Sequence, residues 1–186
     1  MCGIVGMVSA GRPVDAEAVT KMATALAHRG PDDHGTWISE DRQVGLGHRR
    51  LAIIDLSPLG HQPMHSAEGD LVVVFNGEIY NFRDVRAELE ARGHVFRSSG
   101  DTEVLLAAYK VWGVNCLSRL AGMFSFALWD ARARRLFVAR DRAGEKPLFY
   151  RHEKDRFVFA SELKGILTDR NIERSINHEA LEDYLT

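Results

Sequence analysis

Cysteine is scarce in this chain of 186 residues, and its two cysteines, Cys2 and Cys116, lie far apart. They form neither the paired spacing of a metal site nor the framework of a secreted disulfide-rich domain, so we expect reduced thiols and a cytoplasmic protein. Long apolar runs are also missing. None approaches the roughly 20 residues that a membrane-spanning helix needs, and no basic and apolar leader follows Met1. The composition therefore predicts a chain without a membrane partner.

A surplus of charge of either sign is missing as well. The formal net charge is -2, from 24 Lys and Arg against 26 Asp and Glu residues, so no general basic field favours nucleic acid as a partner. Repeats and low-complexity tracts are absent too. With 45% hydrophobic residues, the chain can fill the core of one globular domain, which we place at 1–186.

Helical spacing of apolar residues predicts three helices: one over 15–28, one between Asn81 and Gly93, and one from Asp101 to Gly113. We expect a left-handed Gly30 to end the first helix and the Asn81 side chain to cap the second. A further helix is expected over 161–167, and the apolar face of 176–186 is typical of another.

Short β-branched or aromatic runs, bounded by Gly, Asp, Pro or charged residues, predict the strands. In chain order they are 4–8, "GLGHRRLAII" (45–54), "LVVVF" (71–75), "HVFRS" (94–98), "FSFALWD" (124–130), "RLFVARD" (135–141), "PLFYRH" (147–152) and "RFVFAS" (156–161). The links 131–134 and 153–155 are too short for parallel crossovers, so they predict antiparallel hairpins. The pattern favours an α+β sandwich of two largely antiparallel sheets covered by helices.

Cys2 has two interpretations. It is either a small apolar residue at the start of the first strand or a nucleophile. Met1 is commonly removed when a small residue follows, which would give Cys2 both a thiol and a free α-amine. An α-amine, with an ordinary pKa of about 7.7 to 8.0, is suited to accept the thiol proton near neutral pH.

Three other positions also have two interpretations each. Asn76-Gly77 in "VVVFNGEIYN" is either a hairpin turn or a pair of N–H donors that stabilise a developing oxyanion. Arg50 shares the face of a predicted strand with apolar residues, so its guanidinium should meet a carboxylate of the protein or of a substrate. Asp101, at a predicted helix start, is either an N-cap or a ligand for a positive group.

Seven separated segments carry a further signal: "MCGIVG", "HRGPDDHG", "HRRLAIID", "FNGEIYN", "SGDTE", "GMFSFALWD" and "RDRAGEKPLFY". In this order they resemble the glutaminase domain of class II glutamine amidotransferases, which are N-terminal-nucleophile (Ntn) hydrolases. The wording of "HRGPD" and "GEKPL" is most similar to glutamine-hydrolysing asparagine synthetases. Agreement in content and order over nearly the whole chain makes the resemblance specific.

The resemblance implies a four-layer α/β/β/α sandwich of the Ntn-hydrolase type and the hydrolysis of L-glutamine to glutamate and ammonia. Cys2 would be the nucleophile and form a thioester, while its α-amine moves the proton. Asn76 and Gly77 match the oxyanion hole of the family. Arg50 matches the residue that binds the α-carboxylate of glutamine, and Asp101 matches the one that pairs with its α-amino group.

The glutamine pocket of the family also includes the positions of Leu51, Ala52, Ile53, Ile54 and Glu78. We expect neither a catalytic metal nor a cofactor in this chain, because Pro58, Gly60 and Pro63 argue against the helix that would bring His61 and His65 together. "RDRAGEKPLFY" lacks a phosphate-binding pattern, and we interpret it as a structural loop.

Residues from about 170 to 186 are expected to begin the connection to a further domain. The resemblance implies a C-terminal synthetase domain there, which would use ATP and Mg to transfer the ammonia. Two alternatives stay open: a non-catalytic glutamine-binding or interaction module of the same fold, and an Ntn amidohydrolase acting on another amide. The sequence also leaves a homodimer open.

Overall fold

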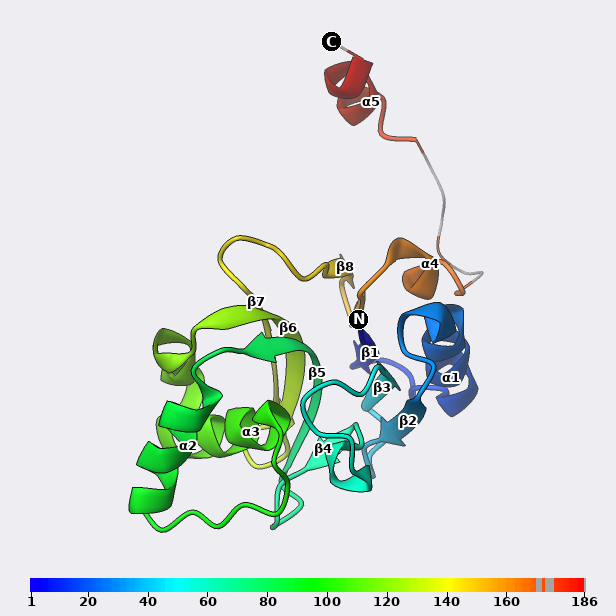
Figure 1. Cartoon of the computed structure of the whole chain (residues 1–186). Coiled ribbons are helices and arrows are strands. Elements are labelled where there is room, and N and C mark those ends of the chain that lie inside the picture. Colours follow the sequence, from blue (N-terminus) through cyan, green and yellow to red (C-terminus); the bar gives the residue numbers. More distant parts are fainter. Residues whose placement is uncertain (170–171, 173–175, 186) are drawn as a thin grey trace.

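The structure, a computed structural model, describes residues 1–169, 172 and 176–185. Two sheets form its centre (Figure 1). The first has the order β2-β3-β1-β9-β8 and consists of β1 (Gly3–Ser9), β2 (Asp33–Ile38), β3 (Val44–Arg50), β8 (Phe149–Glu153) and β9 (Arg156–Ala160). The second has the order β4-β5-β6-β7 and consists of β4 (Met64–His65), β5 (Leu71–Ile79), β6 (Gly122–Asp130) and β7 (Arg135–Arg140). The paired neighbours are antiparallel, as the short links predicted.

Helices cover the outer face of each sheet (Figure 1). The first sheet carries α1 (Ala16–Ala25) and α4 (Leu163–Ile166), and the second carries α2 (Phe82–Ala91) and α3 (Asp101–Trp112). The chain also forms the 3-10 helices η1 (Ala27–Arg29), η2 (Pro58–Gly60) and η3 (Gly113–Arg119). The last helix, α5 (His178–Leu185), stands apart from the sandwich and has exposed side chains.

Three apolar clusters fill the interfaces between the layers. Along β5, Val73 and Phe75 join the cluster under α2 and α3, whereas Val72 and Val74 join the cluster between the sheets, because successive strand residues point to opposite faces. A third cluster, which includes Val5, lies between the first sheet and helices α1 and α4. Three interfaces require four layers, so the predicted α/β/β/α sandwich is confirmed.

The predicted helices form, but two details of their ends were wrong. Gly30 is not left-handed, since its φ is -148°. A Cβ there would lie 2.5 Å from the carbonyl oxygen of Arg49, so a glycine is needed for close backbone approach. Asn81 is the N-cap residue of α2 but makes no side-chain cap bond. Its amide instead binds the backbone of Arg119 and Ala121, at 2.9 Å each.

The predicted strand over 94–98 does not form. The N–H groups of Arg97 and Ser98 donate to the carboxylate of Glu103, at 3.1 and 2.7 Å, which satisfies them without a strand partner. β3 ends at Arg50, so 51–54 is irregular rather than extended. Strands β2 and β4 were not predicted.

The strand register determines which residues meet at one end of the sandwich. β1 and β3 pair with Gly3 opposite Arg49, so Cys2, just before β1, lies beside the residues that follow β3. β5 of the second sheet packs against β1 and β3. The start of β1, the end of β3 and the second half of β5 therefore converge.

Candidate active site

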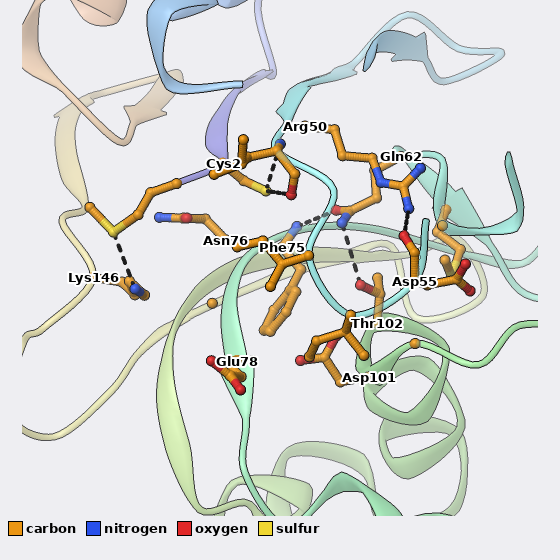
Figure 2. A pocket seen from close by; sticks show the side chains of 18 of the residues that line it. Cys2, Arg50, Asp55, Gln62, Phe75, Asn76, Glu78, Asp101, Thr102 and Lys146 are labelled. Carbon is orange, nitrogen blue, oxygen red and sulfur yellow. Dashed lines mark hydrogen bonds between the residues drawn. The ribbon is translucent and has the colours of Figure 1, made fainter. Parts of the chain in front are cut away.

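A cavity of about 160 Å³ lies at this convergence, next to the first turn of α3 (Figure 2). All but one of the residues that the sequence indicated line it: Cys2, Arg50, Leu51, Ile53, Ile54, Asn76, Gly77, Glu78 and Asp101. Ala52 does not line the cavity, and its N–H donates to Asp32 Oδ2 at 2.8 Å. The fold thus brings together side chains that are up to about a hundred positions apart.

Cys2 is held through both its side chain and its backbone. The N–H of Leu51 lies 3.4 Å from Cys2 Sγ, and the Leu51 carbonyl oxygen lies 3.6 Å from it. On the other side, Arg29 Nε donates to the Cys2 carbonyl oxygen at 2.8 Å. Arg29 in turn pairs with Glu162, whose Oε1 is 2.9 Å from Arg29 Nη1. The thiol therefore has a defined place at the cavity wall.

Burial raises the pKa of the Cys2 thiol above its ordinary value. The hydrogen bond from Leu51 and the positive charges of the N-terminus and Arg50 oppose this rise without cancelling it. Because a thiol attacks carbon only as the thiolate, this one needs a nearby base to react at neutral pH.

Along the second half of β5, side chains accept the backbone N–H groups on the edge that faces β4. β4 is only two residues long. Beyond it, the N–H of Phe75 donates to Gln62 Oε1 at 2.6 Å, and the N–H of Ile79 donates to Asp101 Oδ2 at 3.0 Å. Strand N–H groups alternate between the two edges, so the N–H of Gly77 lies on this same edge, between the two bonded ones and at the cavity.

Asn76 and Gly77 lie inside β5, so the hairpin-turn interpretation was wrong. Asn76 is 1% exposed, and its Nδ2 has no hydrogen-bond partner among the residues that the structure describes. A Cβ at Gly77 would lie 2.6 Å from Phe124 Cα on β6, which explains the glycine. A buried amide donor without a partner is costly, so this pair is suited to an oxygen that arrives with a ligand.

Arg50 brings a positive charge to the cavity. Its guanidinium donates to two neutral oxygens, the carbonyls of Ser57, at 3.0 Å, and Asp55. Within the described part of the chain, no carboxylate lies at ion-pair distance from it. The internal salt bridge is therefore not formed, whereas Arg49 points the other way and donates to Ala23 on α1.

Asp101 brings a negative charge. It is the first residue of α3, and the N-cap residue is Gly100, so the capping interpretation was wrong. The Asp101 side chain is buried, and burial, helped by the charge of Glu78, raises its pKa to about 6. Near neutral pH the carboxylate is ionised and suited to a cationic group.

The cavity residues Gln62 and Lys146, and His48, which is bonded to the cavity residue Phe75, were not identified from the sequence. Gln62 links Phe75 to α3, because its Nε2 donates to Thr102 Oγ1 at 3.4 Å. His48 binds the Phe75 carbonyl oxygen at 3.0 Å, and burial lowers the His48 pKa to about 3, so the ring is neutral. Lys146, from the segment interpreted as a structural loop, also lines the cavity. Isolated residues of this kind carry no spacing signal.

The arrangement places a thiol, two N–H donors, the Arg50 guanidinium and the Asp101 carboxylate in a single cavity. An amide with an α-amino-acid head would meet a complementary group at each of its polar ends. No cluster of three or more His, Cys, Asp or Glu side chains in the described ranges is arranged to hold a metal ion. Among the described helices, none has the length and apolar character to cross a membrane.

Comparison with known proteins finds relatives among the asparagine synthetases. Asparagine synthetase [glutamine-hydrolyzing] 3 of Bacillus subtilis is 43% identical over 98% of this chain, which spans 30% of that protein. A putative asparagine synthetase [glutamine-hydrolyzing] 2 of Methanocaldococcus jannaschii is 40% identical over 99% of this chain, which spans 39% of that protein. The chain therefore covers well under half of these relatives.

A solved structure supports the fold. Glutamine phosphoribosylpyrophosphate amidotransferase from B. subtilis superposes with a TM-score of 0.76 over 89% of this chain and 43% of its own, at 24% identity. The sequence model of the glutamine amidotransferase domain matches residues 1–186. This match and the similarity to the curated relatives show that the chain belongs to the glutamine amidotransferase domain family.

Proposed function

We propose that this domain hydrolyses the side-chain amide of L-glutamine, with Cys2 as the nucleophile. The observation that carries the proposal is the unpartnered, buried Asn76 Nδ2 beside the Gly77 N–H, in the same cavity as the Cys2 thiol. Two such donors are what an amide oxygen needs as it becomes an oxyanion.

The reaction would begin once Met1 has been removed. The freed α-amine of Cys2 takes the thiol proton, and the thiolate attacks the amide carbon. Asn76 and Gly77 stabilise the negative oxygen. The C–N bond then breaks, and ammonia leaves with the proton that the amine held. Water next attacks the thioester, which releases glutamate and restores the thiol.

Charge would select the substrate. Arg50, which lacks a carboxylate partner among the described residues, binds the α-carboxylate, and Asp101 binds the α-ammonium group. An acyl amide without an amino-acid head would leave both charges buried and unpaired, which is costly. Glutamine therefore fits this cavity better than other amides do.

The test is glutamate release from L-glutamine, measured on protein that mass spectrometry shows to begin at Cys2. Activity should be lost in Cys2→Ala and kept in Cys116→Ala, a matched control because Cys116 is buried in the core away from the cavity. Activity that survives Cys2→Ala would refute the nucleophile. Glutamine binding without turnover in the wild type would favour a binding module.

We also propose that residues from about 170 to 186 lead to a synthetase domain that binds ATP and Mg and consumes the ammonia, in the cytoplasm. The support is that this chain spans 30% and 39% of two similar asparagine synthetases. Of the connection, residues 170–171, 173–175 and 186 lie outside the described residues. Asparagine formation from aspartate, ATP and ammonia by this chain alone would contradict the proposal.

A further inference from the structure

Lys146 is a buried lysine at the edge of the candidate active site. It is 6% exposed and lines the same cavity as Cys2 (Figure 2). Its Nζ lies 3.2 Å from the Sδ of Met1, and a thioether is only a weak acceptor. Among the described residues, no carboxylate is within ion-pair distance of this ammonium.

The backbone around Lys146 is built to hold it in place. Its N–H donates to Asp141 Oδ2 at 3.0 Å, and its carbonyl oxygen accepts from Arg140 Nε at 2.6 Å. Asp141 also accepts the N–H of Phe124 on β6, the residue that pairs with Gly77. The loop that carries Lys146 is therefore tied to β6, the strand next to the oxyanion donors. These bonds keep Lys146 at the cavity even though a buried unpaired charge is costly.

Removal of Met1 would change what Lys146 faces. The covalent path from Met1 Sδ to Cys2 N measures about 6 Å when fully extended. Lys146 Nζ therefore lies at most about 10 Å from the nitrogen that becomes the free α-amine. Once the Met1 side chain has left, the ammonium and the amine share one partly buried cavity.

Other charged groups lie around Cys2, and most of them have a counter-charge or a substrate partner. They are Arg29, Arg50, Glu78, Asp101 and, beyond Arg29, Glu162. Asp55 and Asp141, which also lie close by, accept backbone N–H groups instead. Arg29 is neutralised by Glu162, and Arg50 and Asp101 would be neutralised by glutamine itself. Among the described residues, Glu78 has no ion-pair partner either, and its charge is the same in every Lys146 variant. Lys146 is the cation at this cavity that neither an ion pair nor glutamine compensates.

We propose that Lys146 acts through the α-amine of Cys2, favouring its uncharged form, which is the form that accepts the thiol proton. Two cations in one low-dielectric cavity repel each other, so the ammonium of Lys146 disfavours protonation of the amine. This inference rests on the proposed function. Lys146 is a positioning residue, because it acts on the proton acceptor and not on the substrate.

The size of the effect follows from Coulomb's law. At about 10 Å, with an effective dielectric constant of about 20, one charge shifts the pKa of the amine by about one unit. Without Lys146 the amine should titrate about one unit higher. At pH 7 the rate should then fall up to about tenfold, and it should recover at alkaline pH.

The experiment is the pH profile of kcat/KM for glutamine in Lys146→Met, Lys146→Gln and Lys146→Arg, each shown by mass to begin at Cys2. Lys110→Met is the matched control, because Lys110 is a surface residue paired with Glu68. Asp101 titrates near pH 6, so the profiles are compared above that value, where the amine titrates. We expect an upward shift of about one unit in the Met and Gln variants, and none in the Arg or Lys110 variants.

The outcomes separate this inference from the proposed function. Superimposable profiles for wild type and both neutral variants, with wild type active, would overturn the role of Lys146 alone. A uniform loss at every pH, shared by Lys146→Arg, would also overturn it, because charge would then not be what matters. An inactive wild type that begins at Cys2 would overturn both proposals. Melting temperatures identify a variant that fails to fold, and the second neutral variant then decides.

Discussion

Replacing Asp101 by Asn should make the ligand-free protein more stable while it weakens glutamine binding. The Asp101 carboxylate is 5% exposed and receives a hydrogen bond from the N–H of Ile79. An Asn side chain can accept that bond through its amide oxygen and keeps nearly the same shape. The substitution therefore removes the negative charge and little else.

The magnitude follows from the pKa of Asp101, which burial raises from 3.8 to about 6. Because the folded-state pKa is the higher one, protonation favours the folded state. The wild type has this advantage in full below pH 3.8 and loses it as the pH rises through about 6. A shift of about two units corresponds to about 3 kcal/mol, an upper limit that local relaxation reduces, so about 1 to 3 kcal/mol is expected.

The assay is urea unfolding of wild type and Asp101→Asn at several pH values without glutamine. The variant should be the more stable one at pH 8, and the difference should shrink towards pH 4. Asp84→Asn is the matched control, because Asp84 is exposed on α2. In the same proteins, KM for glutamine should rise in Asp101→Asn. A stability difference that is absent, or that does not depend on pH, would refute the reasoning about the buried charge.

Three further predictions follow from the site and the fold. Asn76→Ala should lower kcat about 10² to 10³-fold with little change in KM in steady-state glutaminase assays; a change confined to KM would contradict its role as oxyanion donor. Arg50→Met should raise KM for glutamine at least about tenfold, because charge-assisted bonds contribute about 1.5–3 kcal/mol each; an unchanged KM would count against the carboxylate site. Gly30→Ala should destabilise the fold by at least about 1–3 kcal/mol in urea unfolding, because its Cβ would lie 2.5 Å from Arg49 O; unaltered stability would show that the backbone can move apart.

Local patterns were enough for much of the fold. The apolar spacing in α1, the alternation along β5 and the short links between hairpins each depend on neighbours in the sequence, so helices, strands and antiparallel pairing were predictable. Residues 94–98 were not, because a distant carboxylate, that of Glu103, takes the backbone bonds that a strand partner would have taken. β2 escaped notice because it contains a glycine and has exposed positions.

The sequence by itself determined the chemical groups available to this protein: a cysteine at position 2, an Asn-Gly pair, an arginine and an aspartate in an order that resembles one family. It left each of them with two interpretations. The tertiary structure decided among these, because hydrogen-bond partners and burial depend on which strands meet. Among the described residues Asn76 Nδ2 has no partner, and Asp101 is buried, because β5, the residues before β1 and the first turn of α3 meet at one cavity. Lys146 reaches the same cavity from a loop about seventy residues after Asn76 in the chain. No local sequence pattern encodes this proximity.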